Sequence, residues 1–412
     1  MTENTTPTSV HGIANGKDST YADIAQGQIV TFGRGSKPES TAPLDAEGLS
    51  IKPGRINAHT HIYSGLAPLG MPEPDVAPEN FLQILERVWW RLDRALDEAS
   101  LRASAQLYVA KSLLYGTTTL VDHHESPQLI EGSLDIIADV CQELGMRALL
   151  CYGITERNFG RDEARRGLKE CRRFIEQNKR PLVQGMVGIH ASFTVSDESI
   201  RETGELCREL NIPLHIHLAE DGADVKDAQE RGYAGPLQRL LALNALPPRS
   251  LLAHGVHLQR DEVLLAEEND AFFMQNPRSN EGNAVGYAGV LAAGKAVAIG
   301  TDGYPADMLA EVEALRRLAG DNNDDMPKVE NRIEGAYSLL NRHFDAPFSP
   351  LARGSMADII IEDENDGSPP RHVMVNGQRV VSDGQLVNGN LKEIEEFATS
   401  QAAALWSRMK DL

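Results

Sequence analysis

Two histidines stand two residues apart at the end of a predicted strand. They are His59 and His61, in the stretch RINAHTHIYSG at residues 55–65. Side chains two residues apart on a strand point to the same side of it. The two imidazoles can therefore share one cation, because zinc and similar metals accept imidazole nitrogens as ligands. Such metals usually take three or four protein ligands, so a metal site here requires further residues from elsewhere in the chain.

Two later stretches offer the missing ligands. HIHLAE, residues 215–220, supplies a further histidine, and GTDG, residues 300–303, supplies the carboxylate of Asp302. A lone pair of histidines two residues apart is weak support for a metal site. The pair becomes far more specific when a histidine follows a fifth strand and an aspartate follows an eighth, in that order. The sequence therefore predicts one divalent metal, with zinc as the first choice and iron as the alternative, because N and O ligands suit both.

The histidines of the chain concentrate where a barrel would gather them. Of twelve histidines, nine lie at or just past the ends of predicted strands. Barrel enzymes build their active sites at the carboxyl ends of their strands. Chance placement would not collect histidines there, so the distribution predicts an active site at that end. The nine are His59, His61, His123, His124, His190, His215, His217, His254 and His257.

The middle of the chain alternates between short β-rich runs and longer helical segments. Eight β-rich runs occur, from RINAHTH near residue 55 to AVAIGTDG near residue 300. Segments with apolar residues at helical spacing lie between them, such as SDESIRETGELCRELN. Strands that alternate with helices imply a parallel sheet. Eight such units predict an α/β fold with a closed (β/α)8 barrel, which we assign to residues 53–349.

The two chain ends differ from the middle. Residues 1–52 and 350–412 carry β-like runs punctuated by glycine, and VNGQ and SDGQ are hairpin turn signals. We expect the two ends to form one small β-sandwich domain beside the barrel, followed by a final amphipathic helix. The proline-rich loop at residues 67–80 is either a flap over a pocket or a plain connector.

The composition excludes several classes of partner. The net charge of −20 repels phosphate backbones and anionic membranes, so nucleic acid and membrane are not expected partners. No apolar run is long enough to span a bilayer, and the polar N-terminus shows no secretory pattern. The four cysteines form no close pairs, which argues against a disulfide framework and fits a reducing cytoplasm.

These motifs resemble those of the amidohydrolase superfamily, in its deaminase-like branch with a single metal. The resemblance extends over almost the whole chain and is closest to aminohydrolases and chlorohydrolases related to guanine, 8-oxoguanine and triazine deaminases. It is carried by LERVWWRLDRALDE, VDHHESP, GIHASFTVSDE, HIHLAE and NPRSN. Superfamily members with two metals bridge them through a carboxylated lysine on the fourth strand, and VQGMVGIHAS contains no lysine. Relatives are often dimers, so the resemblance implies a homodimer.

The resemblance also implies roles for individual residues. Glu220 corresponds to a glutamate that shuttles protons, and His254 corresponds to a histidine that polarises the water or the substrate. His190 falls where relatives often contact substrate. A metal-generated hydroxide would attack the carbon that bears an exocyclic amine, while carboxylates move the protons. The residues that correspond to the metal ligands are His59, His61, His217 and Asp302.

Other residues near the strand ends have two interpretations each. His123 and His124 are neighbours on a strand, so at most one can point into the pocket, and we take His124 as the candidate substrate contact. Trp89 either lines the pocket or belongs to the core. Asn158 either contacts the polar edge of a substrate or is a solvated loop residue. His215 faces inward but deeper, where we expect it to pack or to support a metal ligand.

Three functions fit this pattern. We expect a hydrolase that acts on C–N bonds other than peptide bonds and deaminates a small purine-, pterin-, pyrimidine- or triazine-like heterocycle. Ring opening or dechlorination by the same metal hydroxide is the second candidate, and only the product would distinguish it. The third is a metal-binding barrel that has lost catalysis. The complete set of polar groups needed for the chemistry speaks against the third candidate.

Overall fold

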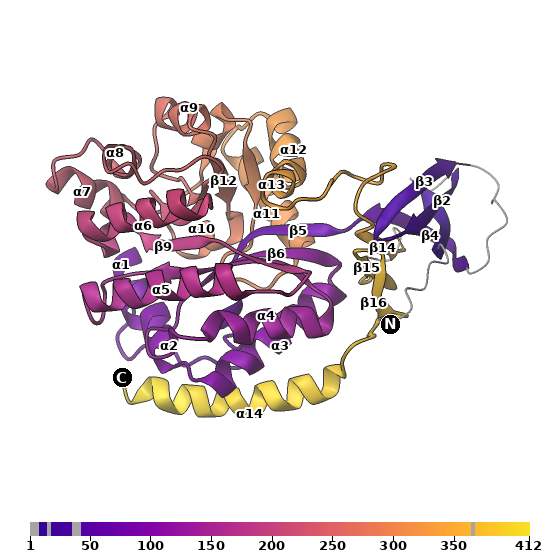
Figure 1. Cartoon of the computed structure of the whole chain (residues 1–412), viewed down its shortest axis with the longest axis horizontal. Coiled ribbons are helices and arrows are strands. Elements are labelled where there is room, and N and C mark those ends of the chain that lie inside the picture. Colours follow the sequence, from indigo (N-terminus) through magenta and orange to yellow (C-terminus); the bar gives the residue numbers. More distant parts are fainter. Residues whose placement is uncertain (1–7, 15–17, 35–42, 364–366) are drawn as a thin grey trace.

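The computed structural model describes residues 8–14, 18–34, 43–363 and 367–412. Within these residues the strands form two sheets. One sheet is parallel and surrounded by helices, and the other lies at one side of the molecule (Figure 1).

The parallel sheet closes into a barrel. Its strands are hydrogen-bonded in the order β13-β12-β11-β10-β9-β7-β6-β5, with a short strand β8 beside β7. A bridge between Thr60 and Asp302 joins the first and last strands, and the Thr301 amide donates to the His59 carbonyl at 2.9 Å. The expected (β/α)8 barrel is therefore confirmed. Its strands in the described residues are β5 (Arg55–Thr60), β6 (Thr117–His124), β7 (Arg147–Ile154), β8 (Val183–Gly185), β9 (Val187–Ala191), β10 (Leu214–Leu218), β11 (Leu251–His254), β12 (Phe272–Gln275) and β13 (Val297–Ile299).

Apolar side chains fill the barrel below the histidines. Every residue of β7 is buried, as expected for a parallel strand covered on both faces. Residues that alternate along the strands point inward and form one cluster with helix α13 (Ala336–His343), which lies under the barrel. This cluster includes Ala58, Leu149, Ala253 and Met274. The polar strand ends therefore lie above a dry, packed floor.

Helices follow the strands around the barrel. The segment SDESIRETGELCRELN forms a helix as expected: Ser196 caps its first turn by accepting from the Ser199 amide, and it ends at Asn211 with φ 53°. This helix is α6 (Asp197–Leu210). The other α-helices in the described residues, besides α13, are α1 (Phe81–Ile84), α2 (Trp90–Ala95), α3 (Glu98–Leu114), α4 (Ser133–Leu144), α5 (Arg161–Gln177), α7 (Gly222–Glu230), α8 (Pro236–Ala242), α9 (Arg260–Glu268), α10 (Pro277–Gly282), α11 (Met308–Asp321), α12 (Met326–Glu334) and α14 (Leu391–Lys410). None of them is long and apolar enough to cross a membrane, within the part of the chain that is described.

Strands from both chain ends form the second sheet, which confirms the expected small β-sandwich. Its order is β17-β16-β15-β14-β4-β1-β2-β3, so β4 and β14 join the two ends. The two predicted turns form hairpins, with positive φ at Asn376, Gly377, Asp383 and Gly384. The described strands are β1 (Thr8–Ala14), β2 (Asp18–Ala25), β3 (Gln28–Arg34), β4 (Pro43–Pro53), β14 (Ile359–Glu362), β15 (His372–Val375), β16 (Gln378–Ser382) and β17 (Gln385–Leu386).

The last helix, α14, returns to the barrel. It lies along α2 and α3 and far from the second sheet at its C-terminal end (Figure 1). Arg408 donates to the Ala95 carbonyl at 2.8 Å, and Arg91 donates to the Met409 carbonyl at 2.7 Å. The C-terminal region therefore contributes both to the sandwich and to the outer layer of the barrel.

Candidate metal and active site

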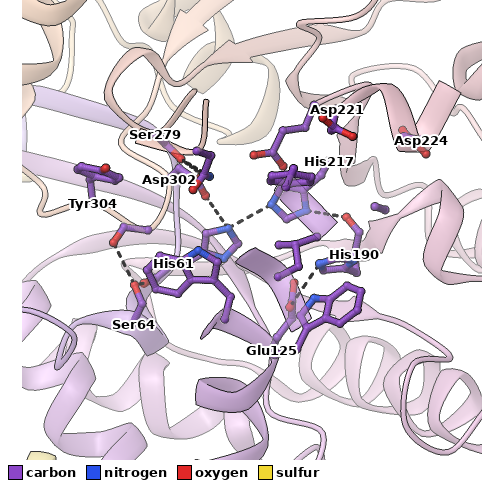
Figure 2. Close-up of a pocket in the computed structure, with 18 of the residues that line it drawn as sticks. His61, Ser64, Glu125, His190, His217, Asp221, Asp224, Ser279, Asp302 and Tyr304 are labelled. Carbon is purple, nitrogen blue, oxygen red and sulfur yellow. Dashed lines mark hydrogen bonds and ion pairs between the residues drawn. The ribbon is translucent and has the colours of Figure 1, made fainter. Parts of the chain in front are cut away.

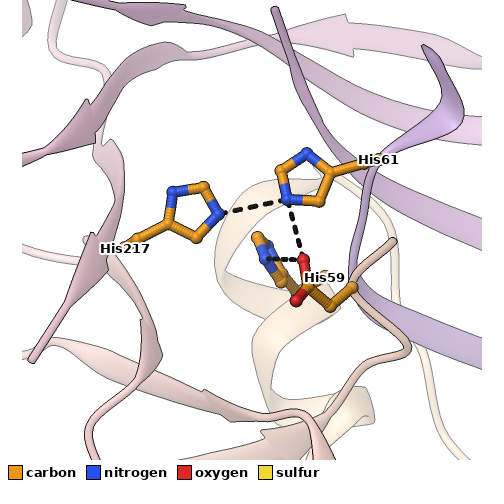
Figure 3. Close-up of side chains that lie close together, drawn as sticks. His59, His61 and His217 are labelled. Atoms are coloured by element: carbon orange, nitrogen blue, oxygen red, sulfur yellow. Dashed lines mark hydrogen bonds and ion pairs between the residues drawn. The ribbon is translucent and has the colours of Figure 1, made fainter. Parts of the chain in front are cut away.

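The four predicted metal ligands meet at the carboxyl end of the barrel. His59 and His61 come from β5 and the residue after it, His217 from β10, and Asp302 from the loop after β13 (Figure 3). One ligand atom of each residue lies within 4.8 Å of the others. All four side chains are buried. Residues spread over more than 240 positions of the chain thus converge at one point because β5 and β13 close the barrel.

Hydrogen bonds on the outer side of the rings determine which nitrogens face this point. Nδ1 of His61 donates to the His123 carbonyl at 2.6 Å, and Nδ1 of His217 donates to the His190 carbonyl at 2.6 Å. A carbonyl oxygen can only accept, so both Nδ1 atoms carry a proton. In the neutral rings, both Nε2 atoms therefore present lone pairs to the cluster, as metal ligands require.

The cluster has the chemistry of a cation site. Nε2 of His61 lies 3.1 Å from Nε2 of His217 and 2.8 Å from Oδ1 of Asp302. Nε2 of His59 is buried and faces the same carboxylate, 3.5 Å from Oδ1 of Asp302. Burial opposes charge on His61, but Asp302 outweighs it and raises the pKa of His61 to about 9. A metal cation at this point would take the place of the second ring proton of His61. Three imidazole nitrogens and one carboxylate are a donor set that fits a divalent metal such as zinc.

His215 supports the cluster from below. Its Nε2 lies 2.9 Å from Nδ1 of His59, and its Nδ1 lies 3.6 Å from Sγ of Cys151. Burial keeps the pKa of His215 well below its usual value, so the ring is neutral. A neutral His215 can accept the Nδ1 proton of His59 and leave Nε2 of His59 free for a cation. This is the supporting position expected for a histidine one pleat deeper on β10.

The backbone at the strand ends is shaped to bring the ligands together. Asp302 and His254 adopt positive φ values of 53° and 75°, which non-glycine residues rarely do. A Cβ at Gly300 would lie 2.5 Å from the backbone nitrogen of His59, so only glycine fits between β13 and β5. Strained and close-packed backbone of this kind is typical of functional sites.

Glu220 and His254 lie beside the cluster. Nε2 of His254 is 3.5 Å from Oε2 of Glu220 and 3.9 Å from Oδ2 of Asp302. Burial, reinforced by the charge of Asp302, raises the pKa of Glu220 well above its usual value, which favours the protonated form. Burial lowers the pKa of His254, so its ring is neutral. The arrangement places a proton donor and a proton acceptor next to each other at the cation site.

Two residues of the NPRSN stretch position these groups. The hydroxyl of Ser279 donates to Oδ2 of Asp302, and Nδ1 of His254 donates to Oδ1 of Asn280 at 2.8 Å. Both residues lie on α10, which begins at Pro277 directly after β12. Their roles depend on contacts with the ends of β11 and β13, which the sequence pattern of NPRSN does not reveal.

A cavity opens above the cluster (Figure 2). One wall is apolar and comes from α1, the π-helical turn Leu85–Trp89 and the start of α2. It consists of Phe81, Leu85, Trp89 and Trp90, and Phe193 faces the cavity from another loop. The loop at residues 67–80 does not line this cavity, so the cover over the site is helical.

The polar lining comes from several strand ends. In Figure 2, His61, His217 and Asp302 lie between Ser279 and Tyr304 on one side and His190 and Glu125 on the other. The remaining polar residues of the lining are Tyr63, Ser64, Glu220, Asp221, Asp224 and Asn283.

The structure brings two of the four candidate substrate contacts to this cavity. His190 and Trp89 line it, whereas His124 and Asn158 do not. His124 points outward from β6, where its Nε2 bonds to Ser126, because its neighbour His123 takes the inward direction. The side chain of Asn158 instead binds Glu163 in the first turn of α5, at 2.9 Å.

Arg157 ties the apolar wall to the barrel. Its Nη2 donates to Asp93 at 2.8 Å and to Glu125 at 3.1 Å, and its guanidinium stacks on Trp90 at 4.7 Å. Burial alone would lower the pKa of Arg157, but Asp93 and Glu125 outweigh it and raise the pKa, so the guanidinium stays charged. Sequence reasoning missed Glu125, although it directly follows the two histidines at the end of β6.

Comparison with known proteins places this geometry in a family. Residues 50–380 match the amidohydrolase family. The chain is 28% identical over 394 residues to a 5'-deoxyadenosine deaminase of Methanopyrus kandleri, and the match covers 87% of each protein. It is also 28% identical over 388 residues to a 5-methylthioadenosine/S-adenosylhomocysteine deaminase of Moorella thermoacetica, covering 87% of this chain and 88% of that protein.

Solved structures share the fold. An adenosine deaminase from Xanthomonas campestris with bound zinc superposes with a TM-score of 0.79 at 20% identity, covering 98% of this chain and 99% of that chain. An atrazine chlorohydrolase from Arthrobacter aurescens TC1 complexed with zinc superposes with a TM-score of 0.80 at 20% identity, covering 96% of this chain and 100% of that chain. At this level of identity the matches demonstrate a common architecture.

Proposed function

Because the chain belongs to the amidohydrolase family, we propose that it is a metal-dependent aminohydrolase that deaminates a nitrogen heterocycle. One observation carries the proposal: three imidazole nitrogens and a carboxylate converge within 4.8 Å, with Glu220 and His254 beside them. A water held there could be deprotonated and a leaving amine protonated without any residue moving far. The names of the relatives support a purine- or triazine-like substrate, and the proposal also includes pterin- and pyrimidine-like rings.

We propose that one zinc ion is held at this site, with iron as the alternative. A bound divalent metal of this kind supplies hydroxide at neutral pH by lowering the pKa of its water. The zinc in the two solved structures belongs to those proteins. For this chain, the proposal of zinc is supported by its own cluster of three imidazole nitrogens and one carboxylate. The proposed ligands are His59, His61, His217 and Asp302.

The residues around the site can manage the protons of the reaction. Protonated Glu220 would give its proton to a ring nitrogen, which makes the neighbouring carbon more electrophilic. Asp302 and neutral His254 would accept the proton of the attacking water, and Ser279 would hold Asp302 in place. The C–O bond would form first, and the C–N bond to the exocyclic amine would break afterwards. One proton of the water would pass through Asp302 or His254 to the amine, which leaves as ammonia, and the second would return to Glu220 in place of the proton given to the ring nitrogen.

Three further expectations belong to this proposal. Residues 53–349 would form the catalytic domain, and residues 1–52 with 350–412 would form the smaller one. The protein would be a homodimer in the cytoplasm. Size measurement in solution and fractionation of the source cells test the last two.

Ammonia release by the purified, metal-loaded protein tests the proposed function. The panel contains aminopurines, aminopyrimidines, aminopterins and aminotriazines. We expect ammonia from one class, and none from the Asp302→Asn or Glu220→Gln variants. Glu230→Gln, on the exposed face of α7, is the matched control and should retain full activity. Silence from the whole panel contradicts deamination, and a mass increase of one water in the same mixtures would then indicate ring opening.

A further inference from the structure

The lining of the cavity over the site is rich in carboxylates, of which Asp302 belongs to the cation site and Glu125 is paired with Arg157. It includes five carboxylates but no lysine or arginine side chain, among the residues that the structure describes. Three of the five, Glu220, Asp221 and Asp224, come from the loop after β10 and the first turn of α7. Glu125 and Asp302 complete the set.

The nearest guanidinium groups are already committed. Arg157 lies behind Trp90 with its side chain only 6% exposed, and it is paired with both Asp93 and Glu125. Arg278 is held by Glu311 at 2.5 Å and by backbone carbonyls. Neither can offer an uncompensated positive charge to a ligand in the cavity.

Asp221 is the carboxylate that is least compensated. It caps α7 by accepting from the Ala223 amide at 2.9 Å, and no ion pair is recorded for it within the described ranges. Asp224, by contrast, is buried and bonded to the Ser192 hydroxyl and the Ala219 amide. A ligand that extends past the cation site therefore meets the negative charge of Asp221.

The aromatic part of the lining suits a flat ring. A Cβ at Gly303 would lie 3.7 Å from the indole of Trp89, so this ring covers the loop that carries Asp302. Phe193 and Trp90 flank His190 with their ring edges. Aromatic walls stack on planar heterocycles without requiring charge on them.

Resting on the proposed function, we infer that the substrate is a planar aminated heterocycle whose remaining part is neutral or positively charged. The pocket rejects analogues that carry a phosphate or carboxylate, and Asp221 is a main determinant of that rejection. A buried or half-buried carboxylate without a cationic partner repels an anionic ligand more strongly than an exposed one, because solvent screens it less.

Matched pairs of compounds test this inference. Each pair shares one aminated ring and differs in charge: adenosine and its 5'-monophosphate, cytidine and its 5'-monophosphate, pterin and pterin-6-carboxylate. Ammonia release gives kcat/KM and calorimetry gives Kd for the metal-loaded protein. We expect the neutral member of any accepted pair to be favoured by about tenfold or more, as for like-charge juxtaposition in a binding site.

The Asp221→Asn variant connects the preference to the residue. Asparagine also caps helices well, so the variant should fold. It should lower the ratio of kcat/KM for the neutral compound to kcat/KM for the anionic compound severalfold. Glu230→Gln, which makes the same charge change on an exposed part of α7, should leave this ratio unchanged. The inference is overturned if the anionic compound of a pair is accepted as well as or better than the neutral one. It is also overturned if Asp221→Asn does not change the ratio of their kcat/KM values.

Failure of the proposed function gives a different result. If no compound releases ammonia, deamination is contradicted, and the binding data alone decide the inference. Binding of neutral members with exclusion of anionic ones would still support it. Binding of both, or of none, would overturn it.

Discussion

Individual hydrogen bonds determine how each side chain of the site can act. His254 has two ring nitrogens, and its bond to Oδ1 of Asn280 places the proton on Nδ1. Nε2 is then an acceptor that faces Glu220 and Asp302. Asn280 is therefore a positioning residue, although it is neither a member of the cation cluster nor a lining residue of the cavity.

Replacement of Asn280 by leucine should reduce kcat by about 10- to 100-fold, the usual effect of removing a supporting hydrogen bond at a metal site. KM should change little, because Asn280 does not line the cavity. Steady-state kinetics on the accepted substrate, with metal content as control, measures this. Asn280→Asp keeps an acceptor and should recover part of kcat. Equal losses in both variants would contradict a role in placing the proton.

Asp224 should make stability depend on pH. Burial raises its pKa to about 6, although Ser192 and the Ala219 amide partly oppose this. The folded protein therefore binds this proton more tightly than the unfolded chain. The stabilisation of the folded state by this proton is complete below about pH 4 and is lost as pH rises through about 6.

Asp224→Asn removes that dependence. Relative to the variant, the wild-type free energy of unfolding should fall by about 3 kcal/mol between pH 4 and pH 7, since two pKa units separate the states. Denaturant titrations across this range measure the difference. Asp162→Asn, at an exposed position on α5, should show a difference that stays flat with pH. If the free energy of unfolding changed with pH in the same way for wild type and Asp224→Asn, Asp224 would not be the source of the pH dependence.

At the scale of elements, one ion-pair network holds the apolar wall over the site. The wall is one continuous helical segment, residues 81–95, in which a π-helical turn separates α1 from α2. Arg157, from the loop after β7, fixes it through Asp93 on α2 and Glu125 after β6. The apolar wall thus depends on a contact between α2, the loop after β6 and the loop after β7.

Arg157→Met should destabilise the protein by about 3–5 kcal/mol, because it leaves the buried carboxylate of Asp93 without its ion-pair partner and removes the arginine partner of Glu125. Denaturant unfolding measures the loss, and Arg157→Met combined with Asp93→Asn should recover part of it. Arg166→Met is the matched control, since its pair with Glu131 is exposed and contributes about 1 kcal/mol or less. If Arg157→Met were no more destabilising than this control, the network would not support the wall.

For the whole molecule, the cation site coincides with the closure of the barrel. His59 and His61 belong to the first barrel strand and Asp302 follows the last one. The same seam contains the bridge between Thr60 and Asp302. A bound metal would therefore connect the two ends of the parallel sheet as well as serve the reaction.

Removal of the metal should lower Tm. A ligand present at 100 times its Kd stabilises the folded state by about 2.7 kcal/mol, and chelation removes this. Thermal unfolding before chelation, after chelation and after return of zinc measures the effect. The Asp302→Asn variant should show a much smaller difference between these states. A Tm that is insensitive to chelation in the wild type would argue against a metal at the seam.

Much of the site could be predicted from the sequence because the signal was local. The spacing of His59 and His61 follows from the period of a strand, and the order of the strands assigns His217 and Asp302 to the same end of a barrel. The barrel itself follows from eight strand and helix units. The hairpins at Asn376–Gly377 and Asp383–Gly384 follow from turn chemistry alone.

The other features of the site depend on contacts between residues that are distant in the chain. The local spacing of residue types in the sequence does not predict such contacts. Only the folded structure decides that His123 rather than His124 turns inward, since either neighbour fits an alternating strand. It alone pairs Arg157 with Asp93 across 64 positions and lays α14 along α3. It also places Asp221 beside the cavity. The sequence by itself thus determined the fold and pointed to the candidate ligands, whereas the tertiary packing decided the walls of the site and their charge.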